Sequence, residues 1–190
     1  MNVRLKIFPL AALWLIMAVA APAQEATNRP AAWAKPLEVA GIKNCYLVTT
    51  NLYRGAQPTA AGVKNLKALG VRTVISLRDL HSDTDVLAGA GLKSVRLKME
   101  PWHSDEDEVV EFLKAATDTN NLPVFVHCER GADRTGTMCA MYRIVVCGWT
   151  KPQALDEMKN GGFGFNPVWK NLVDFIEKAD IADIKRRVGL

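Results

Sequence analysis

Short apolar runs alternate with segments of helical periodicity over most of the chain, and this alternation is the feature that most constrains the fold. Residues 71–77 are rich in β-branched side chains and residues 94–99 alternate, so both predict strands. Between residue 58 and the first of these strands, Thr59 is the expected N-cap of a helix and Gly70 follows its end. Strands that alternate with helices favour a mostly parallel central sheet flanked by helices. We therefore predict a single α/β domain.

The remaining elements follow the same reasoning. Ser104 is the predicted N-cap of a further helix, and Asp107, three residues later, completes a capping box. Residues 46–48 and 52–53 are expected to form short strands or a bent ribbon, and a further strand is expected at 122–127. Further helices are expected at 104–116, 134–147, 152–159 and 167–178.

The N-terminal segment predicts export. Arg4 and Lys6 precede an apolar run at 10–21, and the small residues Ala21 and Ala23 follow, which is the order of a cleaved signal peptide. The run is shorter than the about 20 residues of a membrane-spanning helix, so we expect no membrane span after cleavage. We predict a periplasmic or secreted protein.

The domain boundaries follow from this prediction. Residues 1–23 form the signal peptide, residues 24–40 a proline-containing extended lead-in, and residues 41–190 the folded domain. The 190-residue sequence is 49% hydrophobic and 23% charged, which excludes a disordered protein. Its net charge of +4 is too small to indicate nucleic-acid binding. We also expect the protein to be a monomer.

Export allows disulfides to persist, so the four cysteines matter. Cys45, Cys128, Cys139 and Cys147 allow three complete pairings, which the sequence alone does not separate. Cys139 and Cys147 are predicted on one helix, where eight residues span about 12 Å, farther than the about 7 Å of a disulfide. The disulfide state of Cys45, Cys139 and Cys147 is left open.

The segment 126–136 joins the end of an apolar strand to the start of an apolar helix. Successive backbone N–H groups of such a loop can bind an anion at the positive end of the helix. Cys128 lies at the start of the loop, where the same field favours the thiolate. Arg134 can hold two oxygens of a phosphate, and Thr135 can donate to the sulfur. The candidate phosphate-binding residues are Glu129, Arg130, Gly131, Ala132, Asp133 and Arg134.

These residues resemble the signature of the cysteine-dependent protein tyrosine phosphatases, in which His-Cys is followed after five residues by Arg-Ser/Thr. The chain is similar to the dual-specificity branch of this superfamily. The segments 52–58, 148–149 and 161–164 also resemble its compact and exported bacterial members. The resemblance implies hydrolysis of phosphotyrosine in protein substrates through a phosphocysteine on Cys128, with no metal or cofactor. Activity on phosphoserine and phosphothreonine is left open.

Each residue of the loop also has a purely structural interpretation. Cys128 could be a buried thiol and Arg134 a cation at a helix start, although a cation there is unfavourable unless an anion is bound. His127 is interpreted as a packed histidine that tunes the cysteine, with no zinc site around it. Glu129 and Asp133 could simply point to solvent.

The resemblance further implies a general acid on a mobile loop, and the matching segment is 100–108. We assign Asp105, because it lies three residues after Trp102 at a loop-to-helix junction, as in the exported bacterial members. Asp107 is assigned to the cap, and Glu100 is the third choice. A structural alternative is that these acids only suit the helix dipole.

Two other functions fit the same loop residues. One is an exported inositol-phosphate phosphatase that uses the same loop, although the chain is short and its loop has no added lysines. The other is a pseudo-phosphatase that binds phosphorylated partners without turnover. A sulfurtransferase, an arsenate reductase and a low-molecular-weight phosphatase fit the order of motifs poorly.

Overall fold

The computed structural model describes residues 29–100 and 102–190. The predicted signal peptide at 1–23 and the first residues of the lead-in lie outside this part. Among the described residues, no helix combines the length and the apolar character that crossing a membrane requires.

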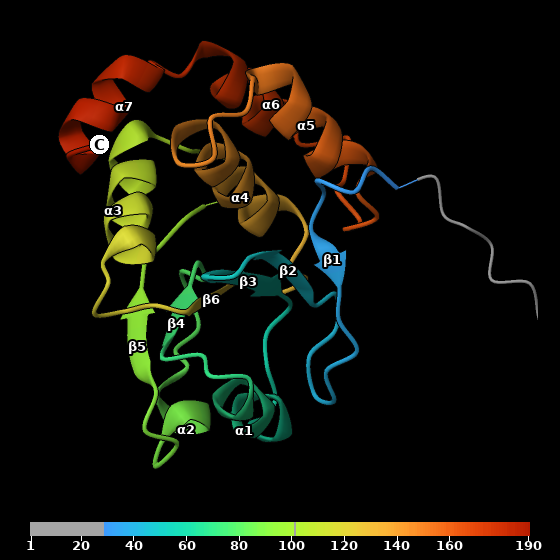
Figure 1. Cartoon of the computed structure of the whole chain (residues 1–190), viewed down its shortest axis with the longest axis vertical. Helices are drawn as coiled ribbons and strands as arrows, with labels where there is room; N and C mark the ends of the chain where they lie inside the picture. Colours follow the sequence, from blue (N-terminus) through green and yellow to red (C-terminus); the bar gives the residue numbers. More distant parts are fainter. Residues whose placement is uncertain (1–28, 101) are drawn as a thin grey trace, which may run out of the picture.

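A six-stranded sheet forms the centre of the described chain, with the strand order β1-β2-β3-β6-β4-β5 (Figure 1). The pairs β3–β6, β6–β4 and β4–β5 are parallel, whereas β1–β2 and β2–β3 are antiparallel. The predicted α/β domain is confirmed, but its sheet is mixed, because the first strands turn back on each other. The strands are β1 (Lys35–Pro36), β2 (Tyr46–Thr49), β3 (Leu52–Gly55), β4 (Thr73–Ser76), β5 (Lys93–Arg96) and β6 (Val124–His127).

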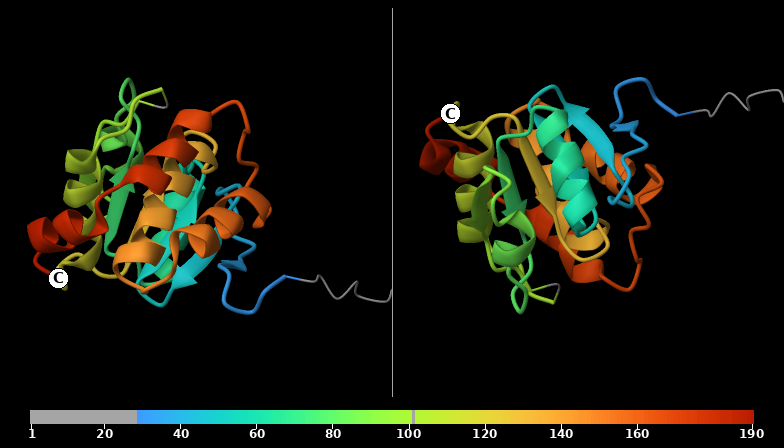
Figure 2. Two further views of the ribbon diagram at one scale, coloured as in Figure 1. Left: turned by 90° about the horizontal axis from the view of Figure 1, so that it is seen from above. Right: turned by 90° about the horizontal axis from the view of Figure 1, so that it is seen from below.

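Helices cover both faces of this sheet, as the two views of Figure 2 make clear. One face carries α1 (Ala60–Ala68) and the short α2 (Thr84–Leu87). The other face carries α3 (Glu106–Thr117), α4 (Asp133–Val145), α5 (Lys151–Asn160), α6 (Lys170–Lys178) and α7 (Ile181–Val188). Of these helices on the two faces, α2 and α7 were not predicted from the sequence.

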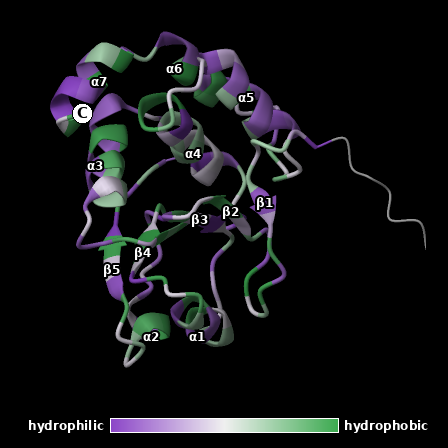
Figure 3. Ribbon diagram, viewed as in Figure 1, coloured by the Kyte–Doolittle hydropathy of each residue, from purple (hydrophilic) through white to green (hydrophobic). Residues whose placement is uncertain are grey.

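The alternation of side chains along the central strands gives the domain two hydrophobic cores. Val74 and Phe125 belong to the smaller core on the side of α1 and α2. Their neighbours Ile75, Val124 and Val126 belong to the larger core, which α3 to α7 cover. Figure 3 shows apolar residues on β4 and α3, and hydrophilic residues on the outer surface of α7. Both faces of the central strands are therefore buried, which explains their continuous apolar runs.

The N-cap residues of α1 and α3 were both predicted from the sequence and can be compared with the structure. Thr59 caps α1 as predicted, since its side chain accepts a hydrogen bond from the Gly62 N–H at 3.2 Å. The predicted cap of α3 by Ser104 and Asp107 is wrong by one residue. The N-cap is Asp105, which accepts from the Glu108 N–H at 2.9 Å while Glu108 accepts in return from the Asp105 N–H. The longer glutamate can reach back across the first turn, as a capping box requires.

All four cysteines are free in this structure. Cys147 lies just past the end of α4 rather than on the same helix as Cys139. Burial raises the pKa of Cys45 and of Cys139 to about 11, so both are thiols at neutral pH. These two cysteines are therefore poor nucleophiles.

Candidate active site

The predicted phosphate-binding loop lies between the end of β6 and the start of α4, at the centre of the sheet. Cys128 directly follows β6 and is 3% exposed, and Arg134 lies in the first turn of α4. Because β6 is parallel to both of its neighbours, β3 and β4, the carboxyl ends of all three strands meet at the loop. Ligands of open α/β sheets bind at this edge.

A cavity of about 170 Å³ opens at the loop. It brings together Cys128 and Arg134, the two residues that the sequence assigned to nucleophilic attack and phosphate binding. Its full lining is Cys128, Glu129, Arg130, Asp133, Arg134 and Trp169.

A second cavity of about 240 Å³ adjoins the first, since Glu129 and Arg134 line both. It combines the exposed apolar side chains Leu80 and Trp102 with several charges. The other lining residues are Arg78, Asp79, Met99 and Glu100.

The guanidinium of Arg134 is held by two backbone carbonyls. Its Nη1 donates to the Leu77 oxygen at 3.3 Å and to the Met99 oxygen at 3.2 Å. These carbonyls come from the segments that follow β4 and β5. The sheet edge therefore positions the arginine, and its other guanidinium nitrogens make no hydrogen bond within the described residues.

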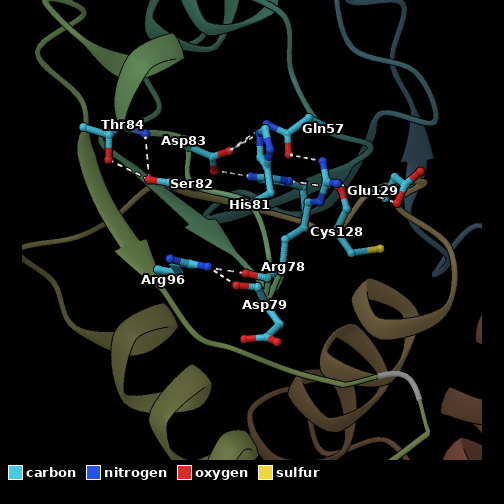
Figure 4. Close-up of polar contacts among 11 residues, drawn as sticks. Gln57, Arg78, Asp79, His81, Ser82, Asp83, Thr84, Arg96, Cys128 and Glu129 are labelled. Carbon is cyan, nitrogen blue, oxygen red and sulfur yellow. Dashed lines mark hydrogen bonds and ion pairs between the residues drawn. The ribbon is translucent and has the colours of Figure 1, made fainter.

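His127 is fully buried behind the nucleophile and bonded at both ring nitrogens. Its Nε2 lies 2.7 Å from Asp83 Oδ2, and its Nδ1 lies 3.1 Å from the Cys128 carbonyl oxygen. Gln57 Nε2 donates to the other oxygen of Asp83 at 2.6 Å (Figure 4). Burial raises the pKa of Asp83, but the hydrogen bonds and charge of His127, with Gln57 and Ser76, outweigh it and hold the pKa below its usual value.

No pattern in the sequence pointed to Asp83. It lies 44 positions before His127 in a polar segment with no motif, and only the fold brings the two together. Gln57 belongs to the segment 52–58, whose resemblance to known family members assigns this side chain no role. Its side chain joins this buried network, and its backbone N–H donates to the Glu129 oxygen at 3.2 Å. The residues behind the nucleophile are therefore supplied by distant segments.

Two acidic residues of the loop differ in their surroundings. Glu129 points outward, with its side chain 67% exposed and 3.7 Å from Arg78. The alternative that Asp133 points to solvent is wrong. Asp133 is buried, accepts from the Asn166 N–H at 2.8 Å and pairs with Arg130 at 2.6 Å.

Gly131 and Thr135 also have distinct environments. Gly131 has a φ of +69°, and a Cβ there would lie 2.3 Å from the backbone of Gly55, so only glycine fits. The Thr135 hydroxyl is buried and makes no hydrogen bond within the described residues. Its predicted bond to the Cys128 sulfur is not formed in this structure and stays a prediction for the reaction.

The candidate acids are spread over the segment after β5. Asp105 uses Oδ1 to cap α3, and its Oδ2 lies 3.9 Å from His103 Nε2. Asp107 pairs with Arg187 of α7. Of these three candidate acids, Glu100 alone belongs to a cavity lining, that of the second cavity, which Arg134 also lines. The structure does not bring Asp105 into the lining of either cavity, and its role as the acid stays a prediction.

Within residues 29–100 and 102–190, no group of three or more His, Cys, Asp or Glu side chains is arranged to hold a metal ion. The charge stabilisation that the site can offer within this range comes from backbone N–H groups and guanidinium groups.

Residues 43–170 match the family model described as "DSP-PTPase phosphatase fused to NAD+ Kinase". Dual specificity protein phosphatase TpbA of Pseudomonas aeruginosa is 36% identical over 168 residues, which cover 86% of this chain and 74% of that protein. Inositol diphosphatase DSP3 of Arabidopsis thaliana is 28% identical over 153 residues, covering 75% of this chain and 73% of that protein.

Solved structures agree with these relatives. The crystal structure of P. aeruginosa TpbA matches with a TM-score of 0.76 and 34% identity, covering 84% of this chain and 98% of that one. A cysteine-to-serine variant of TpbA in complex with phosphotyrosine matches with a TM-score of 0.76 and 33% identity, covering 85% and 98% of the two chains.

Proposed function

Since this chain belongs to the dual-specificity phosphatase-like family of cysteine-dependent phosphatases, we propose that it hydrolyses phosphotyrosine in proteins through a phosphocysteine on Cys128. The observation that carries the proposal is the strand–loop–helix unit at the sheet edge. It holds Cys128 and Arg134 in the lining of one cavity at the start of α4.

The first chemical step is attack of the Cys128 thiolate on phosphorus. Loop N–H groups and Arg134 hold the equatorial oxygens, and the P–O bond to the substrate breaks as the P–S bond forms. Asp105 gives a proton to the departing tyrosine oxygen. Because Asp105 lies outside the cavity lining, this step requires the segment between β5 and α3 to move toward the loop.

The second step is hydrolysis of the phosphocysteine. Asp105, now ionised, takes a proton from water, and the oxygen of that water attacks phosphorus. The Cys128 thiolate leaves, with the Thr135 hydroxyl as its hydrogen-bond donor. Backbone and guanidinium groups supply the positive charge, so this scheme uses no metal.

The test is phosphate release from a phosphotyrosine peptide by residues 24–190, with reductant and chelator present. The wild type should turn over, whereas Cys128→Ser should lose turnover and still bind the peptide. Cys139→Ser is the matched control, because it replaces a buried thiol of α4 that the mechanism does not use. Wild-type rates in Cys128→Ser would rule out the scheme. Silence in both proteins, with the fold intact, would favour the pseudo-phosphatase.

We also propose that the protein is exported to the periplasm or beyond. The order of basic, apolar and small residues in segment 1–23 supports this proposal. Expression of the full chain followed by fractionation should give a mature protein that begins at Gln24 outside the cytoplasm. An intact N-terminus in the cytoplasmic fraction would contradict it.

A second candidate is hydrolysis of inositol pyrophosphates, because several relatives are named inositol diphosphatases. The charges beside the loop argue against it. The adjoining cavity carries Asp79, Glu100 and Glu129 against Arg78 and Arg134, so a polyanion meets repulsion there. Initial rates on a phosphotyrosine peptide and on an inositol pyrophosphate at equal concentration separate the two functions. A faster rate on the inositol substrate would reverse the order of the candidates.

A further inference from the structure

The segment 52–58 contains a buried arginine that the mechanism above does not use. Arg54 lies at the carboxyl end of β3, opposite Val126 of β6 in the parallel register, and is 2% exposed. Its guanidinium lies 3.7 Å above the ring centroid of Phe163. The edge of the guanidinium that carries Nη2 is directed at the phosphate-binding loop. Arg54 therefore lies under the loop, on the side away from solvent.

Arg54 has no acidic partner among the residues that the structure describes. Its Nη2 donates to the Gly131 oxygen at 2.8 Å and to the Ala132 oxygen at 3.4 Å, and its Nε has no hydrogen-bond partner in the same range. A buried charge without a counter-charge is unfavourable. A second buried arginine provides the contrast, since Arg143 is stacked on Trp149 and also makes two hydrogen bonds to Glu157.

The hydrogen bonds of Arg54 fix the direction of two loop peptides. In a planar trans peptide the carbonyl and the following N–H point in opposite directions. When Arg54 holds the carbonyls of Gly131 and Ala132 below the loop, the N–H groups of Ala132 and Asp133 are turned to its other side. That side is where the loop and α4 present N–H groups to an anion.

We propose that Arg54 is a positioning residue of the phosphatase reaction, which holds these N–H groups toward the phosphoryl group and whose charge is balanced by that group when substrate binds. The inference rests on the proposed function, because it needs a phosphoryl group at the loop. It explains why the arginine lacks a carboxylate partner within residues 29–100 and 102–190: a fixed carboxylate there would weaken the positive potential of the anion site.

Four variants of residues 24–190 test the proposal. Arg54→Met removes charge and donors, Arg54→Gln keeps an amide donor without charge, and Arg54→Lys keeps the charge. Arg143→Met is the matched control, because it removes a buried, ring-stacked arginine that is remote from the loop and already neutralised. The readouts are the competitive inhibition constant of inorganic phosphate, kcat and KM on a phosphotyrosine peptide, and the melting temperature with and without phosphate.

Arg54→Met should weaken phosphate inhibition by about 10- to 100-fold, as expected for the loss of a charge-assisted hydrogen bond. Arg54→Lys should recover most of this loss and Arg54→Gln less. The rise in melting temperature caused by phosphate should be smallest in Arg54→Met, larger in Arg54→Gln and larger still in Arg54→Lys. Arg143→Met should lower the melting temperature and leave phosphate inhibition of the folded protein unchanged.

Wild-type phosphate inhibition in folded Arg54→Met or Arg54→Gln would overturn the proposal, as would an equal loss in Arg143→Met. If Arg54→Met does not fold, Arg54→Gln and Arg54→Lys decide, because equal phosphate inhibition in the two would exclude a role of the charge. A wild-type protein that neither turns over nor binds phosphate would instead refute the proposed function, and the inference with it.

Discussion

The two sides of the phosphate-binding loop are built differently. Behind the loop, Arg54, Asp83 and His127 are at most 2% exposed. Arg54 and His127 are hydrogen-bonded to backbone carbonyls of the loop, and Asp83 is hydrogen-bonded to His127. In front of it, Leu80 is 97% and Trp102 is 65% exposed. The buried side is held in place by packing and hydrogen bonds, whereas the side chains of the open side are exposed to solvent.

The buried side serves nucleophilic attack and phosphate binding, whereas the open side serves proton transfer to the leaving group. The nucleophile and the phosphate-binding groups must be held in place before substrate arrives, because their value lies in preorganisation. The acid must reach a leaving oxygen that belongs to the substrate, so it can come from a segment that closes afterwards.

The largest effect is expected on the open side, at the assigned acid. Asp105→Asn should lower kcat on a phosphotyrosine peptide by about 1,000-fold, because the leaving oxygen then departs without a proton. The loss should be smaller on an aryl phosphate whose leaving group is a weak base. Steady-state kinetics on the two substrates measure both effects.

The neighbouring acids provide the controls for this prediction. Glu100→Gln lies in the lining of the adjoining cavity, and Asp107→Asn removes only a pairing with Arg187. Both variants should keep most of the activity. If Glu100→Gln shows the leaving-group dependence and Asp105→Asn does not, the acid is Glu100, and the open side is assembled without movement of the helix cap.

On the buried side, Asp83→Asn should lower the free energy of unfolding by about 3 kcal/mol, because it removes a buried carboxylate that is hydrogen-bonded to His127 and Gln57. The ionised carboxylate is favoured in the folded state, since the pKa of Asp83 is held below its usual value. Its contribution is therefore present above the ordinary aspartate pKa and is lost as the pH falls through the lower folded value. Urea unfolding of wild type and variant should converge in acid.

Asp79→Asn is the control for Asp83, because Asp79 is a nearby acid whose side chain is one-third exposed and only 3.8 Å from Lys98. It should change stability by less than about 1 kcal/mol. A stability of Asp83→Asn equal to that of wild type at neutral pH would mean that the buried network is dispensable. The buried side and the open side would then not differ in the way proposed.

A smaller effect is expected on substrate selectivity at Glu129, which lines both cavities. Glu129→Gln removes one exposed negative charge without altering the backbone that binds phosphate. It should raise kcat/KM for an inositol pyrophosphate about threefold relative to a phosphotyrosine peptide, and added salt should reduce this gain. Equal gains for both substrates would show that Glu129 repels any phosphate and does not select between them.

The buried and open sides also differ in how far the sequence predicts them. The strand at 122–127, the following loop and the helix after it are contiguous, so their periodicity and spacing predicted the placement of Cys128 and Arg134. Asp83 and Arg54 reach the loop only through the parallel pairing of β3, β4 and β6, which no local pattern encodes.

The N-cap of α3 was predicted one residue too early for another reason. Ser104, Asp105 and Asp107 are all chemically suited to a helix start, and several acids lie within one turn. Side-chain length decided the cap in favour of Asp105 and Glu108, and this competition is settled by the three-dimensional fit of the first turn. The mixed character of the sheet was missed because β1 and β2 are short and carry weak patterns.

The smallest effect is expected at Glu108, where the open segment joins α3. Burial, reinforced by the Asp105 charge and opposed by the Asp105 N–H bond, raises the pKa of Glu108 from 4.5 to about 7. The folded protein then holds a proton that the unfolded chain releases, so this residue makes the fold less stable as the pH rises from 4.5 to 7. Glutamine keeps the capping hydrogen bond without the charge.

Between pH 5 and pH 8, the melting temperature of Glu108→Gln should therefore rise by about 2 °C relative to wild type, a small shift because the residue is only half-buried. Glu111→Gln, on the exposed face of α3, should show no such trend. Thermal melts of the three proteins at both pH values measure it. A constant difference would mean that Glu108 opens to solvent with the acid segment, so that the flexibility of the open side extends into the first turn of α3.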